Sequence, residues 1–203
     1  MKKFIALVII STFLLFPLLM SAQNSRRQST LKLQSPEDTK IGFVIHGGAG
    51  VITREGMSPE KEAAYTAALE TALEAGAAVL RNGGSALDAV EAAVIPMEND
   101  PLFNSGYGAV FTAAGTHELD ASIMDGSTMQ CGAVAGVRTI KHPISLARKV
   151  MTETRHVLLA GDGAEKFADS VGVERVENKH FDTERRRKAL EKLLRERQRT
   201  GSL

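Results

Sequence analysis

The sequence predicts an α+β fold in which helices and short strands pack in layers. Alanine-rich helical patterns come first, over residues 59–80 and again from residue 85, and short apolar runs that predict strands cluster after residue 109. No regular alternation of strand and helix is visible, so a doubly wound sheet is not expected. The formal net charge is +1, from 25 basic and 24 acidic residues. That balance gives no reason to expect a nucleic-acid partner.

The N-terminus has the order of a secretory signal peptide. Two lysines precede an apolar run from Phe4 to Met20, and small residues follow up to Ala22. This run contains Pro17 and lies at the short limit for a membrane-spanning helix, so we expect cleavage before Gln23 rather than an uncleaved anchor or stable membrane insertion. Residues 1–22 are therefore predicted to be the signal, residues 23–40 a polar linker, and the protein secreted or periplasmic.

The first folded elements are expected from residue 41 onward. Ile41–Ile45 predicts a short strand that ends in the glycine-rich turn His46–Gly50. A helix should begin at Ser58, an N-cap residue followed by Pro59 at the first helical position, and run to about Leu80.

A second helix is predicted to start immediately afterwards. Ser85 and Asp88 have the spacing of a capping box, and the many alanines that follow indicate close packing against a neighbour. Further strands are expected at Ala109–Thr112, Leu119–Met124, Ala133–Val137 and Val157–Leu159, with helices after Pro143 and after Gly163. Residues 183–203 form a basic tail, which we expect to be a mobile segment or a solvated helix; a specific anion-binding arm is the alternative.

No complete catalytic set is found among the residues. There is no G-x-S-x-G elbow, and the Gly161–Gly163 segment lacks the third glycine of a dinucleotide fingerprint. Asp120 and Asp125 are expected to point to opposite faces of a strand. Cys131 is the only cysteine, so no intramolecular disulfide is expected. The histidines lack the spacing of a zinc site; they are His46, His117, His142, His156 and His180.

Four segments nevertheless resemble the signature blocks of plant-type L-asparaginases with isoaspartyl peptidase activity. They are Ile45–Gly50, Pro101–Phe111, Glu118–Gly126 and Gly132–Val137, and they occur in the family's order and spacing. The resemblance implies a four-layer αββα N-terminal-nucleophile hydrolase fold. Residues 41–182 of this chain would supply its N-terminal half, the α-subunit portion, and residues 183–203 would lead to the expected cleavage site.

The resemblance also implies how the activity arises. In that family a precursor cleaves itself before a threonine, which becomes both nucleophile and, through its own amino group, general base. The substrate would be L-asparagine or an isoaspartyl dipeptide, and the partner would be a β-subunit half, usually in a dimer of αβ pairs. The family's Thr-Val-Gly start does not occur before Leu203, and Thr200 is followed by Gly201. We therefore expect the nucleophile beyond Leu203, no catalytic residue in this chain, and no activity of the chain alone.

Two supporting sites are implied by the same resemblance. His46, Gly47 and Gly48 match a glycine loop that would press on the cleavage site, although a tight turn at the end of a strand would need the same residues. Asn104 matches a position near the nucleophile, where an amide can orient a hydroxyl by donating and accepting at once. An asparagine that satisfies its own loop is the alternative.

The loop from Met97 to Tyr107 resembles the family's sodium-binding loop. Oxygen-only coordination suits a hard cation, and two prolines that restrain the loop without an ion are the alternative. By position, the ligands would be the backbone carbonyls of Met97, Glu98, Asp100, Phe103, Ser105 and Tyr107. No organic cofactor is expected.

Two classes of function remain open from the sequence. In the first, the chain is the α portion of a hydrolase whose β portion is missing, because the sequence is a fragment or its reading frame is truncated. In the second, it is a non-catalytic partner or relic of the same fold. Glycosylasparaginase-like relatives share the fold, but the glycine-rich blocks fit them less well.

Overall fold

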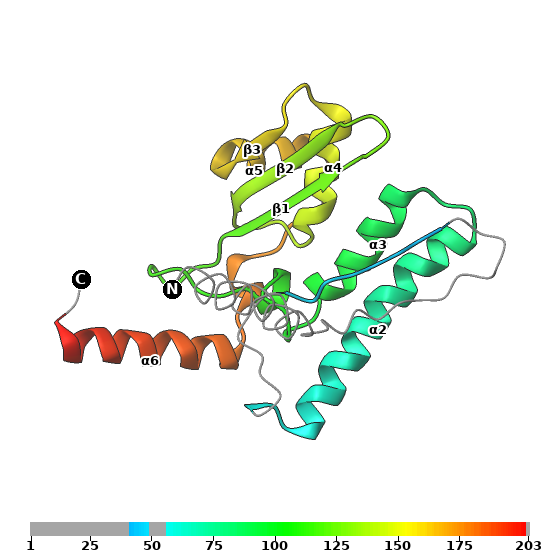
Figure 1. Cartoon of the computed structure of the whole chain (residues 1–203). Helices are drawn as coiled ribbons and strands as arrows, with labels where there is room; N and C mark the ends of the chain where they lie inside the picture. The colour runs from blue at the N-terminus through cyan, green and yellow to red at the C-terminus, as the bar shows by residue number, and fades with distance from the viewer. Residues whose placement is uncertain (1–40, 49–55, 202–203) are drawn as a thin grey trace, which may run out of the picture. The chain divides into compact units, whose positions relative to one another are not determined.

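The computed structural model describes residues 41–48 and 56–201, which contain several helices and a small sheet (Figure 1). The predicted signal peptide and the linker up to residue 40 lie outside the described residues, as do Ala49 and Gly50 of the glycine-rich turn. Among the described helices, none has the length and apolar character needed to cross a membrane.

Two antiparallel neighbours, α2 (Pro59–Arg81) and α3 (Ala86–Glu98), open the described fold. Both predicted helix starts are confirmed. The Ser58 hydroxyl accepts a hydrogen bond from the Lys61 amide. In the capping box, Asp88 N donates to Ser85 Oγ at 3.1 Å and Ser85 N donates to Asp88 Oδ2 at 3.2 Å. The predicted close packing is confirmed too, because most of the residues buried on the two helices are small, with Leu73 and Glu98 the exceptions; the small ones are Ala72, Gly76, Ala77, Ala89 and Ala93.

The described sheet has three strands in the order β1-β2-β3. Strand β1 (Leu119–Met124) pairs antiparallel with β2 (Cys131–Val137), and β2 pairs in parallel with β3 (Leu158–Ala160). Helix α4 (Pro143–Glu153) makes the crossover between the two parallel strands. The sequence did not reveal this strand-helix-strand unit, because β3 is only three residues long and carries too little pattern to indicate its direction.

The sheet is covered by helices on one face. Helices α4 and α5 (Gly161–Val171) lie on that face and share a buried core with it (Figure 1). Along β1 the side chains alternate, with Leu119 and Ile123 buried and Asp120, Ser122 and Met124 exposed. The described part of the chain thus contains one layer of helix on one layer of sheet.

Two predicted strands are wrong. Ile41–Ile45 has no strand partner among the described residues; instead the Phe43 ring packs against Gly76 of α2, where a Cβ atom would overlap it. Residues 109–112 also form no strand, because their polar groups bond to other parts of the chain. The Val110 amide donates to the Asn104 side chain, and the Thr112 amide donates to the Thr116 carbonyl at 2.7 Å.

The basic C-terminal segment is helical. Helix α6 (Glu184–Thr200) begins at Thr183, whose hydroxyl accepts a hydrogen bond from the Arg186 amide. It follows a short 3-10 helix, η3 (Asn178–Phe181), whose Phe181 is fully buried. Over Glu184–Thr200 the structure thus shows a largely exposed helix. Leu193 and Leu194 remain 59% and 41% exposed on it.

Candidate functional site

A hollow of about 640 Å³ lies beside the loop that follows α3. It brings together the predicted glycine loop and the predicted Asn104, which are far apart in the sequence. The hollow has a partly apolar wall and several basic groups, and no acidic side chain is found among the described residues that line it. The lining residues are His46, Gly47, Gly48, Lys61, Tyr65, Val94, Met97, Leu102, Phe103, Asn104, Ser105, Val110, Arg185 and Arg186.

The glycine loop has a conformation that explains two of its residues. Gly48 has φ +114°, which side chains rarely adopt, and its amide lies 3.2 Å from His46 Nδ1. Gly47 faces α2, where a Cβ atom would lie 2.8 Å from a methyl carbon of Leu69. The segment is thus a tight turn placed close to the first helix, with His46 exposed at its start.

Asn104 is held by the backbone that follows it. Its Oδ1 accepts a hydrogen bond from the Val110 amide at 2.9 Å. The side-chain amide group can then offer its N–H donors to a molecule in the hollow. Asn104 also lines a second hollow of about 330 Å³, together with Glu118 and Asp120. One lone pair of the Asn104 oxygen is thus already used, while the second lone pair and the N–H donors are open to a ligand, so the predicted role of donating and accepting at once stays a prediction.

The loop of the proposed sodium site has donors of the right chemistry, since backbone carbonyl oxygens suit a hard cation. Some of these carbonyls also accept hydrogen bonds within the protein. Asp100 O accepts from Phe103 N at 3.3 Å, and Ser105 O accepts from Gly108 N at 3.0 Å. Each carbonyl has a second lone pair, so these bonds are compatible with an additional ligand.

The loop backbone turns back tightly on α3 through two glycines. At Gly106, which has φ +49°, a Cβ atom would overlap the carbonyl of Glu98. At Gly108 it would overlap the carbonyl of Phe103. Both carbonyls belong to the proposed sodium set, so glycine at these positions lets the backbone close around that part of the loop.

The Glu98 side chain has a separate role from its carbonyl. Its carboxylate, 3% exposed, accepts a hydrogen bond from Ile144 N at 3.0 Å and lies 3.2 Å from His142 Nδ1. Helix α4 has no acidic residue in its own first turn, so Glu98 caps it from α3. Burial raises the pKa of Glu98, although the hydrogen bonds to His142 and Ile144 oppose that shift.

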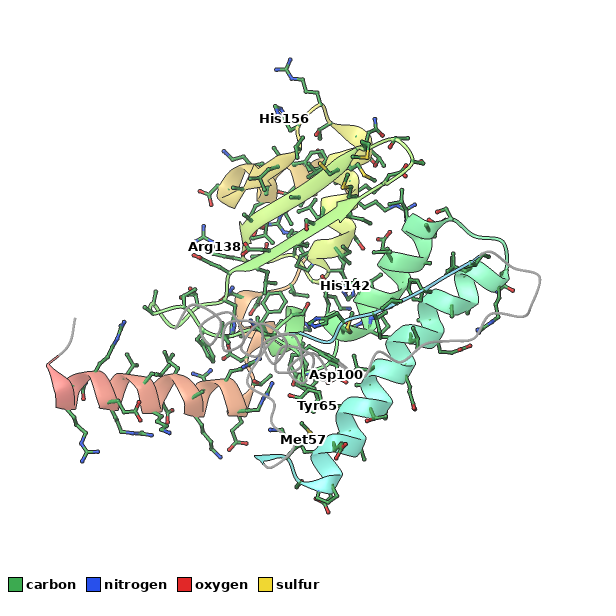
Figure 2. All side chains as sticks on the ribbon, viewed as in Figure 1. Met57, Tyr65, Asp100, Arg138, His142 and His156 are labelled. Atoms are coloured by element: carbon green, nitrogen blue, oxygen red, sulfur yellow. The ribbon has the colours of Figure 1, made fainter. Side chains whose placement is uncertain are left out.

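Three side chains donate hydrogen bonds to carbonyls of the segment from Pro101 to Gly108, and none of them was predicted. The Tyr65 hydroxyl of α2 donates to the Leu102 carbonyl at 3.1 Å, and Figure 2 shows Tyr65 on α2 and Asp100 in the loop. Arg185 donates to Pro101 O at 2.6 Å, and Arg186 Nε donates to Gly108 O at 2.7 Å. Burial lowers the pKa of Arg186.

These contacts could not be found from the sequence. Arg185 and Arg186 lie in a run of basic residues that has the pattern of a solvated helix, and they contact carbonyls about eighty residues earlier in the chain. Only the three-dimensional arrangement distinguishes them from their neighbours.

The comparison with a known protein family covers the residues that line the hollow. The model of the asparaginase family matches residues 39–202. The chain is 52% identical over 144 residues to an isoaspartyl peptidase of Salmonella typhimurium, covering 71% of this chain and 46% of that protein. It is 45% identical over 155 residues to a rat isoaspartyl peptidase/L-asparaginase, covering 76% and 45% of the two chains.

A plant-type L-asparaginase of Pyrococcus furiosus is 45% identical over 163 residues, covering 80% of this chain and 51% of that protein. The chain thus spans about half the length of the curated relatives it matches. With the family model matching most of its residues, the chain belongs to the asparaginase family.

Proposed function

We propose that this chain supplies the N-terminal part of a hydrolase that cleaves L-asparagine and isoaspartyl dipeptides. The observation that carries the proposal is that His46–Gly48 and Asn104 line one hollow in a chain of the asparaginase family. The names of its relatives, isoaspartyl peptidase and L-asparaginase, supply the substrate class.

The proposed reaction is acyl transfer to a threonine hydroxyl. The hydroxyl oxygen attacks the side-chain carbonyl carbon, the C–N bond breaks, and ammonia or an amino acid leaves as an ester forms; water then cleaves that ester to release aspartate. The threonine is expected beyond Leu203, since Thr-Val-Gly does not occur among residues 1–203. Asn104 would donate a hydrogen bond to an oxygen at the reacting centre, and the turn at His46–Gly48 would support self-cleavage.

We also propose that the whole protein has the four-layer αββα fold, assembled with a β-subunit half as a dimer of αβ pairs. The described part of the chain supports this because its sheet has helices on only one face. Asp120, Ser122 and Met124 are exposed on the other face, with Met124 52% exposed. A second sheet stacked on that face would complete the two inner layers.

Two further proposals concern the ion and the compartment. Sodium would be held by the carbonyls of the Met97–Tyr107 loop, where it would fix the backbone that carries Asn104.

Export is proposed from the order of charge, apolar run and small residues up to Ala22. An N-terminal sequence of the cellular product that begins at Met1 would contradict export.

The activity test compares the 203-residue chain alone with the same chain co-expressed with the C-terminal part of the Salmonella relative. We expect ammonia from L-asparagine and aspartate from an isoaspartyl dipeptide only in the mixture. Asn104→Ala should lower kcat of the mixture about hundredfold, because a donor at the reacting centre is lost. Asn82→Ala, at the end of α2 and outside the hollow, is the matched control. Activity of the chain alone, or full activity of Asn104→Ala, would contradict the proposal.

A further inference from the structure

A buried histidine lies beside the site residues without lining the main hollow. His117 is 0% exposed. Its Nδ1 lies 3.2 Å from the Val110 carbonyl oxygen, and its Nε2 lies 2.9 Å from Asp182 Oδ1. A carbonyl oxygen can only accept, so the contact at Nδ1 is a hydrogen bond in which the ring donates to Val110, and Nε2 faces the carboxylate.

The ring of His117 is enclosed by charged and aromatic side chains. The carboxylate of Asp182 faces the ring directly, and the aromatic ring of Phe111 lies with its centroid 4.1 Å from the imidazole centroid. The Arg187 guanidinium pairs with the same carboxylate and lies 5.2 Å from the Phe111 centroid. The carboxylate that faces the His117 ring is thus itself held by a second partner.

The main chain of His117 is fixed as firmly as its ring. Asn178 Oδ1 accepts from His117 N at 3.0 Å, and Asn178 Nδ2 donates to His117 O at 2.9 Å. The backbone of His117 therefore cannot move away from Val110 without breaking its bonds to Asn178 of η3. Because both its backbone and its ring are hydrogen-bonded, His117 can hold the backbone of a neighbouring loop in place.

Val110 connects His117 to the candidate site. Its carbonyl accepts from His117, and its amide N–H donates to Asn104 Oδ1 at 2.9 Å. The backbone of one residue thus joins the buried ring to the side chain that lines the hollow. Loss of the hydrogen bond at the Val110 carbonyl would therefore remove one restraint on the backbone that carries the amide donor of Asn104.

We propose that His117 is a positioning residue that acts through Val110 to aim the Asn104 amide N–H groups into the hollow. The hydrogen bond from Nδ1 does this, while Asp182 fixes the ring from the other side. The effect on catalysis rests on the function proposed above, whereas the link between His117 and Asn104 does not depend on it.

The link is tested by nuclear magnetic resonance on the ¹⁵N-labelled 203-residue chain, alone and with the unlabelled C-terminal part of the Salmonella relative. The Nδ1 of His117 should carry a proton and have the chemical shift of a protonated ring nitrogen. In His117→Gln the Val110 amide and Asn104 side-chain amide signals should move, while the β2 amide of Val134 stays in place. An unprotonated Nδ1, or unchanged Asn104 signals in His117→Gln, would overturn the proposal.

Two further variants distinguish positioning from general destabilisation. In Asp182→Asn the His117 ring can still donate from Nδ1 to Val110 O while Nε2 accepts from the new amide, so the Asn104 signals should stay at their wild-type positions. His156→Gln, which changes an exposed histidine, should also leave them unchanged. If the Asn104 signals move in Asp182→Asn while Nδ1 still carries its proton, the hydrogen bond is not the link. This outcome can be read without His117→Gln, should that variant fail to fold.

The activity of the mixture provides the last readout. His117→Gln should lower kcat about tenfold and change KM less than about twofold, because a misaimed donor affects the transition state more than binding. Asp182→Asn should keep most of the wild-type kcat. A wild-type mixture without activity would contradict the proposed function, and the resonance comparison would still decide whether His117 positions Asn104. An unchanged kcat in His117→Gln would overturn the positioning role.

Discussion

Behind the sheet, α4 buries large apolar side chains, whereas α2 and α3 meet along a seam that is mostly alanine and glycine. In this first region Leu146 and Val150 of α4 are 0% exposed, as is Ile140 just before the helix. In the second, Ala72 and Ala89 are 0% exposed, but Val90 remains 38% exposed on the same helix pair. Burial free energy scales with apolar area, so the sheet region should contribute most of the stability. The helix pair instead brings backbones close together around the candidate site.

The largest expected effect is an overpacked sheet. A Cβ atom at Gly132 in β2 would overlap the Ala147 carbonyl and lie 2.5 Å from Met151 N, both in the backbone of α4. Gly132→Val should therefore lower the free energy of unfolding by about 3 kcal/mol or more, measured by urea denaturation. Gly163→Ala in α5, where a Cβ atom meets nothing within 4 Å, should raise it slightly through helix propensity. Equal losses in both variants would show that the sheet core is not the stabilising region.

A moderate effect is expected where the two regions meet. Glu98→Ala removes the partner of the buried Ile144 amide and should cost about 2 kcal/mol in urea denaturation. Glu98→Gln keeps an acceptor for that amide and should cost less than about 1 kcal/mol. A loss as large in the glutamine variant as in the alanine variant would mean that the charge, rather than the hydrogen bond, joins α3 to α4.

The smallest effect concerns the exposed end of α3 and depends on pH. Hydrogen bonds from Ser85 and Arg148 lower the pKa of Asp88 from 3.8 to about 2. Because the pKa is depressed in the folded state, the stability it contributes is fully present above pH 3.8 and is lost as the pH falls through about 2. Asp88→Asn should therefore lower Tm at neutral pH, and the difference from wild type should vanish near pH 2. Glu70→Gln, exposed on α2, should show no such convergence.

Local signals predicted the helix starts well and the long-range contacts poorly. The capping box at Ser85 and the proline start of α4 depend on neighbouring residues, so a single sequence contains them. The Ile41–Ile45 strand was predicted from apolar residues alone, but a strand needs a partner, and Phe43 packs against α2 instead. The resemblance placed Asn104 in the site, and only the fold shows that Val110 occupies its oxygen.

The unpredicted groups share one physical cause. Glu98 caps a helix that begins 45 residues later, and His117 pairs with an aspartate that lies 65 residues away. A buried carboxylate or imidazole leaves no trace in hydrophobic periodicity, because each satisfies its polar atoms through the tertiary structure. Sequence patterns predict which residues lie in helices and strands far better than which side chains meet across them.

The seam between α2 and α3 has a consequence for the order of folding. Alanine and glycine have no rotamers to restrict, so closing this seam costs almost no side-chain conformational entropy. The two helices are joined by residues 82–85 alone, so their contacts are also short in sequence separation. Structures with local contacts form fast. We therefore expect the α2–α3 hairpin to form on the microsecond timescale, before β3 finds β2, and to present the later strands with a surface already in place.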